Sequence, residues 1–210
     1  MRIAIIGYGK MGHLIEEIAS QRGHEIVARI DQGDTFDLKR ADVAIEFSTP
    51  ATAEGNILRA WDAGVPVVSG TTGWGAQRLI EEDKRSHPKT MLIWKSNFSV
   101  GVNLFFKLNT WLAEQMQTLP QYVPSITETH HIHKLDKPSG TAKTLAEGIG
   151  LLRDRDVEIT SIREGEVPGT HEVRWDSEED TILITHIAKG RRGFALGAVI
   201  AAEELIAING

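Results

Sequence analysis

The sequence predicts an α/β protein that joins a Rossmann dinucleotide-binding domain to an α+β domain with a mostly antiparallel sheet. Strand and helix patterns alternate from residue 2 to residue 94, as in a parallel sheet with crossover helices. A glycine motif joins the first strand to the first helix. Strand patterns dominate the region after residue 156, with only short polar turns between them. We expect residues 1–98 and 190–210 to form the dinucleotide-binding domain and residues 99–189 to form the α+β domain.

Composition narrows the possible functions. The chain has 210 residues, of which 25% are charged and 41% hydrophobic, as in ordinary globular proteins. A net charge of −6 without any block of basic residues argues against a nucleic-acid partner. The absence of cysteine excludes disulfides, thiolate metal sites and a cysteine nucleophile. No apolar run suits a membrane span or a signal peptide, so we expect a cytoplasmic protein without a membrane partner.

The first strand pattern, over residues 2–6, ends in the motif Gly7-Tyr8-Gly9-Lys10-Met11-Gly12, and helical spacing follows. A second strand pattern, over residues 25–30, ends at Asp31. This order is the context that a dinucleotide fingerprint requires. The first two glycines allow a tight turn beside the pyrophosphate, the third packs the helix on the strand, and Asp31 accepts hydrogen bonds from the adenosine ribose. A glycine-rich turn that binds nothing is the less favoured alternative.

The alternation continues with strands over residues 43–47, 65–69 and 91–94 and helices up to about residue 63 and over about 75–86. Ser48-Thr49-Pro50 predicts a helix start directly after the first of these strands. Gly70-Thr71-Thr72-Gly73 and Lys95-Ser96-Asn97-Phe98 follow the other two strands, at the sheet edge where open α/β proteins bind ligands. Taken singly, each of these two turns is equally well explained as a plain loop.

The second domain opens with a long helix over residues 102–117 and a strand over residues 122–128. A helix after residue 142 and strands over residues 157–163, 171–175 and 181–187 complete it. An apolar helical pattern over residues 194–208 ends the chain, and we expect this helix to pack back on the first domain.

The stretch from Glu128 to Ala142 holds three of the eight histidines, two lysines and two carboxylates. Ser139 and Thr141 are N-cap residues by type, and Gly140 lets the backbone approach a ligand. A helix start receives anions, and histidines transfer protons near neutral pH. We interpret the stretch as an acid–base group beside a carboxylate or phosphate cradle. The alternative is a polar loop with a capped helix, whose histidines are solvated or bind a stray metal.

Four of these motifs together resemble the dihydrodipicolinate reductase family, and the resemblance covers essentially the whole chain. They are residues 7–12, 70–73, 97–103 and, close to a family signature, 128–142. Residues 186–198, with Arg191, add a weaker match. The resemblance implies reduction of 4-hydroxy-tetrahydrodipicolinate, a small cyclic dicarboxylate, with loss of water in lysine and diaminopimelate biosynthesis. It also implies NADH or NADPH as the cofactor and a homotetramer whose subunits join through the second domain.

By this resemblance, His130 is the acid–base residue, Lys134 is the second proton donor, and His131, Gly140 and Thr141 hold the substrate carboxylates at the helix start that Ser139 begins. The cofactor-binding set is Gly7, Tyr8, Gly9, Lys10, Met11, Gly12, Asp31, Gly70, Thr71, Thr72, Lys95, Ser96, Asn97 and Phe98. We expect no metal.

The chain departs from the family pattern after Asp31, where only about ten residues precede the next strand and Gln32 stands where many members have Arg or Lys. Because Asp31 repels a 2′-phosphate and Gln32 offers no compensating charge, we expect NADH to be used at least as well as NADPH. Lys39 or Arg40 is the residue that would upset this expectation.

Two other functions fit the sequence. One is another Rossmann oxidoreductase of amino-acid metabolism, although a semialdehyde dehydrogenase needs the thiolate that this chain lacks. The other is a nicotinamide-binding regulator without catalysis, which the complete set of His130, His131, Lys134 and Ser139-Gly140-Thr141 disfavours.

Overall fold

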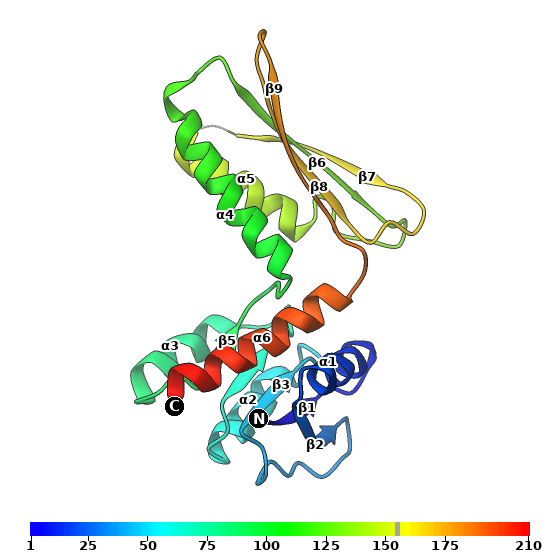
Figure 1. Cartoon of the computed structure of the whole chain (residues 1–210), viewed down its shortest axis with the longest axis vertical. Helices are drawn as coiled ribbons and strands as arrows, with labels where there is room; N and C mark the ends of the chain where they lie inside the picture. Colours follow the sequence, from blue (N-terminus) through cyan, green and yellow to red (C-terminus); the bar gives the residue numbers. More distant parts are fainter. Residues whose placement is uncertain (154–155) are drawn as a thin grey trace. The chain divides into compact units, whose positions relative to one another are not determined.

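The computed structural model describes residues 1–153 and 156–210, and the chain forms two compact units within it (Figure 1). Unit 1 comprises Met1–Val100 with Arg191–Gly210, and unit 2 comprises Gly101–Gly190. The expected combination of a parallel sheet and a mostly antiparallel sheet is confirmed. Among the described residues, no helix combines the length and apolar character that a membrane span needs.

Unit 1 is built on a five-stranded parallel sheet in the order β2-β1-β3-β4-β5. The order changes direction between β1 and β3, which is the topological switch point where such sheets bind ligands. Every residue of β3 is buried, which explains why the strand patterns are continuous apolar runs. The strands are β1 (Arg2–Ile6), β2 (Glu25–Ile30), β3 (Val43–Glu46), β4 (Val67–Ser69) and β5 (Leu92–Trp94).

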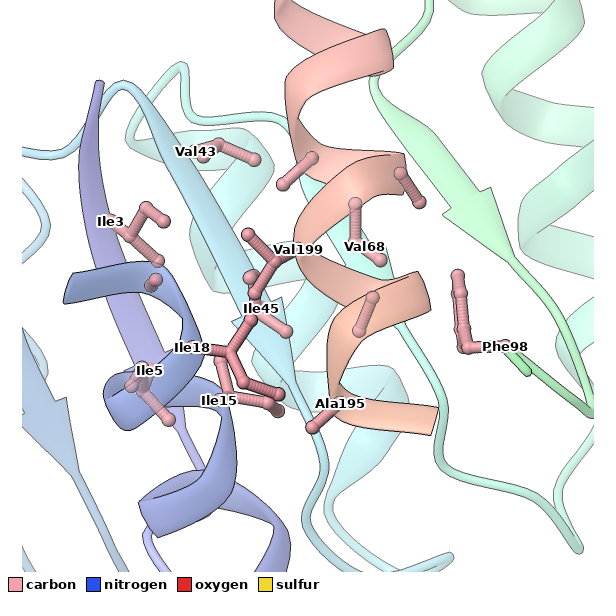
Figure 2. Close-up of a cluster of buried hydrophobic side chains, with 14 of the residues drawn as sticks. Ile3, Ile5, Ile15, Ile18, Val43, Ile45, Val68, Phe98, Ala195 and Val199 are labelled. Carbon is pink, nitrogen blue, oxygen red and sulfur yellow. The ribbon is translucent and has the colours of Figure 1, made fainter. Parts of the chain in front are cut away.

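Four helices cover the two faces of this sheet: α1 (Lys10–Gln21), α2 (Ala53–Asp62), α3 (Ala76–Ser86) and α6 (Arg192–Asn209). On one face, α1 and α6 bury Ile15, Ile18 and Val199 against Ile3 and Ile5 of the first strand (Figure 2). On the opposite face, α2 and α3 bury a second apolar cluster against the alternate residues of the same strand. Two apolar layers therefore hold the sheet that carries the glycine motif.

The C-terminal helix α6 packs on the first unit, as expected, against α1, β3 and β4. Gly197 lies so close to the backbone of Phe98 that a Cβ atom there would collide with the Phe98 carbonyl oxygen. Glycine at this position therefore sets the depth at which α6 sits over the sheet.

One helix start differs from the sequence prediction. The helix after β3 begins at Ala53, three residues later than the Ser48-Thr49-Pro50 pattern indicated. The carbonyl of Thr49 accepts hydrogen bonds from the amides of Thr52 and Ala53, so a turn precedes the helix. The Ser48 hydroxyl, expected as a cap, donates instead to the buried carboxylate of Glu46.

Unit 2 contains a four-stranded sheet in the order β7-β6-β8-β9. The β6–β7 pair is parallel, and the other two pairs are antiparallel. The helices α4 and α5 cover one face around Phe105, Ile126, Leu145 and Trp175. The elements are α4 (Val100–Gln115), the short 3₁₀ helix η1 (Met116–Thr118), β6 (Val123–His130), α5 (Gly140–Arg153), β7 (Glu158–Arg163), β8 (Thr170–Asp176) and β9 (Thr181–Ile187).

The fit of α6 is testable by adding one methyl group. Gly197→Ala should lower the free energy of unfolding by about 1–3 kcal/mol, because the backbone of Phe98 must move to admit it. The control is Gly55→Ala in α2, where a Cβ meets no atom within 4 Å. This control should be neutral or stabilising by up to about 1 kcal/mol. Urea denaturation measures both, and equal effects would contradict the packing argument.

Candidate functional site

The turn after β1 has the backbone geometry that a dinucleotide-binding loop needs. Gly7 has a φ of +90°, and a Cβ on it would collide with the carbonyl of Phe47. A Cβ on Gly12 would lie 2.6 Å from the carbonyl oxygen of Gly7, so the third glycine lets α1 pack on the turn. A Cβ on Gly9 would meet nothing within 4 Å. The middle glycine therefore borders open space, where a ligand backbone can approach.

A cavity of about 400 Å³ lies beside this turn, at the carboxyl ends of β1, β2 and β3. Three residues of the predicted cofactor set line it: Gly7, Gly9 and Asp31. Its size lies within the range of small-molecule sites, and it occupies the switch point of the sheet. The glycine turn and this cavity fit the adenosine side of a dinucleotide.

Asp34, Phe36 and Arg59 also line this cavity and were not predicted from the sequence. The guanidinium carbon of Arg59, from α2, lies 3.8 Å from the ring centroid of Phe36, and both residues line the cavity. Asp34 accepts a hydrogen bond from the amide of Asp31 at 2.8 Å, which adds a second carboxylate to the same wall. Arg59 is therefore the cation that this cavity holds, whereas Arg40 lies 3.4 Å from the carboxylate of Glu25.

A buried glutamate organises the neighbouring loops. Glu46 ends β3 with no solvent exposure. Its carboxylate accepts hydrogen bonds from the Ser69 hydroxyl at 2.6 Å, the Thr71 hydroxyl at 2.9 Å and the Ser48 amide at 3.0 Å. Ser69 ends β4, whereas Ser48 and Thr71 lie in the loops after β3 and β4, so one carboxylate holds the strand end and both loops at the switch point. No local pattern indicates this role, because Glu46 lies within an apolar strand pattern.

The predicted cofactor residues of unit 1 divide into packing and exposed groups. The side chains of Met11 and Phe98 pack in the core, and the ring of Phe98 lies 6.0 Å from that of Phe47. The Tyr8 hydroxyl donates to Glu16. Gly70 has no room for a side chain, because a Cβ would collide with the Phe47 ring. Lys10, Thr72, Lys95 and Ser96 are exposed, and Asn97 accepts a hydrogen bond from the amide of Ser99.

The end of β6 carries the acid–base candidate of unit 2. Glu128 and His130 alternate with Thr129, so strand geometry places both on the inner face of the sheet. Glu128 has no solvent exposure, and His130 is 7% exposed. The carboxylate of Glu128 is hydrogen-bonded to His130 Nδ1, which makes this nitrogen the protonated one in neutral histidine.

Arg163, which pairs with His130 across β6 and β7, completes this arrangement. It donates to Glu128 Oε1 at 2.9 Å. It also donates to the carbonyls of Lys134, at 3.2 Å, and Asp136, at 2.6 Å. A single guanidinium therefore connects the buried carboxylate to the loop that carries Lys134.

The local electrostatics follow from burial and these contacts. Burial raises the pKa of Glu128, but the hydrogen bonds with Arg163 and His130 help to outweigh it, and that pKa lies below its usual range. Burial lowers the pKa of His130, and the adjacent Glu128 carboxylate opposes this effect only in part. The site therefore pairs an ionised carboxylate with a histidine that gives up its proton readily.

His171, on β8, forms the other wall of the site. Its ring lies 5.0 Å from that of His130 in an edge-to-face arrangement. Its Nε2 lies 3.1 Å from the Ser139 hydroxyl, and that hydroxyl also accepts from the amide of Ala142. Ser139 is therefore the N-cap of α5, as its residue type predicted. Burial, and next the charge of His130, lower the pKa of His171 to about 4.

The remaining predicted residues lie in the loop between β6 and α5. Lys134 Nζ lies 2.7 Å from Asp136 Oδ1. Burial raises the pKa of Asp136, but Lys134 and a backbone hydrogen bond from Gly140 contribute to holding it below its usual range. His131 Nδ1 is buried without a hydrogen-bond partner among the described residues. Thr141 is half-buried in the first turn of α5.

Ligand atoms of Glu128, His130 and His171 lie within 4.8 Å of one another, which is also a spacing that metal ions use. Hydrogen bonds to Arg163, Ser139 and each other already account for this closeness. The absence of a metal stays a prediction.

Comparisons with known proteins agree on one family. The model described as dihydrodipicolinate reductase, C-terminus, matches residues 101–209, and the model for its N-terminus matches residues 34–98. A curated 4-hydroxy-tetrahydrodipicolinate reductase from Christiangramia forsetii is 47% identical over 98% of this chain and 92% of its own length. Another protein of that name, from Thermosipho africanus, is 34% identical over the same shares of the two chains.

Solved structures show the same fold. A dipicolinate-bound dihydrodipicolinate reductase from Paenisporosarcina sp. TG-14 superposes with a TM-score of 0.83 at 22% identity, covering 99% of this chain and 95% of that one. Aspartate semialdehyde dehydrogenase II from Vibrio cholerae superposes with a TM-score of 0.59 at 12% identity, over 98% of both chains.

The lowered pKa of His171 predicts a pH dependence of stability. Between about pH 6.5 and pH 4 the unfolded chain binds a proton at this histidine and the folded chain does not, so stability falls as the pH falls. The contribution is on the order of 3 kcal/mol over the whole window. His171→Asn should remove it, flattening the dependence of unfolding free energy on pH relative to wild type. The exposed His133→Asn is the control, and parallel curves for all three proteins would contradict the assignment.

Proposed function

Because the chain belongs to the dihydrodipicolinate reductase family, we propose that it reduces 4-hydroxy-tetrahydrodipicolinate with a nicotinamide cofactor, in lysine and diaminopimelate biosynthesis. The observation that carries this proposal is the 47% identity over 98% of the chain to a curated protein of that activity. The cavity at the glycine turn and the buried histidine site supply the two kinds of group that such a reaction needs.

When bound, the reduced nicotinamide supplies a hydride, which no side chain can provide. His130 then donates a proton to the negative charge that hydride arrival leaves on the substrate. Lys134 is the second proton donor and a cation for the substrate. The Lys134 ammonium is held in place because its side chain is partly buried and because Arg163 donates a hydrogen bond to the Lys134 carbonyl.

The substrate carboxylates are held at the start of α5 by His131, Ser139, Gly140 and Thr141. The Ser139 hydroxyl is already used by the Ala142 amide and His171, so this residue acts by shaping the helix start. Lys134 and the Gly140 amide already hold one carboxylate, that of Asp136. The local charge and the helix start therefore suit a carboxylate ligand.

The cofactor lies on residues 7–12, Asp31, Gly70, Thr71, Thr72 and Lys95–Phe98, with Phe98 contributing its backbone because its ring is buried. NADH is used at least as well as NADPH, since Asp31 and Asp34 place two carboxylates in the adenosine-side cavity. Arg59 is the cation there, and its stacking on Phe36 suits an aromatic base as well as a phosphate.

The active form is a cytoplasmic homotetramer joined through the sheet of unit 2. Within that unit, α4 and α5 cover one sheet face, and Val123, Ile162, Leu183 and Ile187 lie exposed on the other. An apolar sheet face of this kind is typical of a subunit interface. Sedimentation equilibrium measures the stoichiometry, and a monomer at micromolar concentration would contradict this proposal.

The reaction itself is tested by following the oxidation of NADH and NADPH with freshly made substrate. We expect kcat/KM with NADH to equal or exceed that with NADPH, because among the described residues only Arg59 brings a basic side chain to the adenosine-side cavity. Strong preference for NADPH would contradict the cofactor assignment alone. Binding of NADH without oxidation would support the non-catalytic regulator instead.

The two catalytic roles predict different kinetic losses. His130→Gln should lower kcat by roughly two to four orders of magnitude with little change in KM, because the proton donor is lost. Lys134→Ala should also raise KM, because a cation that holds the substrate is lost. His133→Gln, an exposed histidine of the same loop, should leave both constants unchanged. Normal turnover by folded His130 and Lys134 variants would overturn these roles.

A further inference from the structure

We propose that Glu128 and Arg163 are the positioning residues of this site: Glu128 fixes His130 with its proton on Nδ1, and Arg163 locks Glu128 to the loop that carries Lys134. This inference rests on the proposed function for its kinetic consequences. Its structural content, the tautomer of one histidine, is independent of any reaction.

Glu128 is isolated from solvent. It has no solvent exposure, so an unpaired charge there would be strongly destabilising. One of its oxygens meets His130 Nδ1 and the other accepts from Arg163 at 2.9 Å. Because an ionised carboxylate accepts but cannot donate, the imidazole must place a proton on Nδ1. The ring nitrogen available for chemistry is therefore Nε2.

A glycine leaves space beside His130 Nε2. A Cβ on Gly169 would lie 3.0 Å from His130 Nε2 and 3.2 Å from the adjacent ring carbon. Gly169 has a φ of +151°, so both its backbone and its lack of a side chain suit this position. A larger residue would crowd the nitrogen that Glu128 leaves for proton transfer.

Arg163 reaches both Glu128 and the loop that carries Lys134. Besides Glu128, it donates to the carbonyls of Lys134 and Asp136, at 3.2 and 2.6 Å. The planar guanidinium fork can hold all three acceptors in one geometry, which a lysine ammonium cannot reproduce. The orientation of His130 and the path of the Lys134 loop are thereby fixed by the same residue.

The decisive variant is Glu128→Gln. Arg163 donates toward one side-chain oxygen at position 128, so the glutamine carbonyl should take that place and turn its NH₂ group toward His130. Nδ1 must then accept, and the proton of neutral His130 moves to Nε2. Long-range ¹H–¹⁵N spectroscopy of the imidazole should show the Nδ1–H tautomer in wild type and the Nε2–H tautomer in the variant.

Loss of the Glu128 charge should shift the pKa of His130, and with it the pH dependence of kcat, in one direction. The charged groups that face His130 are Glu128 on β6, Lys134 in the next loop and Arg163 on β7, with the titratable His171 on β8. Among these, only Glu128 favours the imidazolium. Glu128→Gln should therefore lower the pKa of His130 and shift the alkaline limb of the kcat profile to lower pH. We expect kcat to fall by up to roughly 10,000-fold, as when a triad carboxylate becomes an amide.

Three comparisons separate positioning from a merely structural role. Adding Glu128→Gln to His130→Gln should cause little further loss, because Glu128 acts through His130. Glu166→Gln removes an exposed carboxylate that lies 3.2 Å from His133 and should leave the profile unchanged. Arg163→Lys should lower kcat and raise KM together, since Lys134 loses its backbone anchor. Should Glu128→Gln fail to fold, the wild-type tautomer and Arg163→Lys still decide the question.

An Nε2–H tautomer in the wild-type protein would overturn the proposal, whatever the protein catalyses. So would an unchanged tautomer and pH limb in folded Glu128→Gln, or additive losses in the double variant. An inactive wild-type protein with the Nδ1–H tautomer would instead overturn the proposed function and leave the positioning intact.

Discussion

The ion pair between Glu128 and Arg163 is the interaction on which the unit 2 site depends. A carboxylate without solvent exposure is stable as an ion only when its oxygens are fully hydrogen-bonded. Arg163 and His130 provide these bonds, and each partner is thereby held in one orientation. The contacts that stabilise this buried carboxylate are therefore also the contacts that orient His130, the proposed acid–base residue.

Unit 1 uses a buried glutamate in a comparable way. Glu46 ends β3, accepts hydrogen bonds from the end of β4 and from the loops after β3 and β4, and holds these loops at the switch point of the sheet. Both glutamates lie at the carboxyl end of a strand, where the rigid sheet meets the variable loops. In each unit, a buried carboxylate on the rigid sheet therefore holds a neighbouring loop in a fixed position through hydrogen bonds.

The two histidines of unit 2 differ because their surroundings differ. His130 is hydrogen-bonded to the carboxylate of Glu128, whereas His171 lies against the neutral hydroxyl of Ser139 and the ring of His130. Burial lowers the pKa of both, and the charge of Glu128 opposes this effect at both, but only at His130 does a hydrogen bond to Glu128 add to the opposition. In the proposed function His130 transfers a proton, whereas the lowered pKa of His171 keeps that residue neutral as a support for the cap of α5.

The sequence by itself determined the features that depend on residues close together in the chain. The glycine turn, the alternation of strands and helices, the N-cap at Ser139 and the return of α6 to unit 1 all follow from local patterns. The start of α2 was the local prediction that was wrong, because the Ser48 hydroxyl bonds to Glu46 instead of capping the helix.

Only the tertiary structure decided which distant side chains meet. Glu128 and Arg163 are 35 positions apart, and Glu46 and Thr71 are 25 apart. Arg59 and Phe36 come from different elements around the adenosine-side cavity. These contacts depend on strand register and on helix packing over the sheet, and no local spacing encodes either. A periodic pattern tells which face of a strand is buried, but the partner across that face is chosen by the fold.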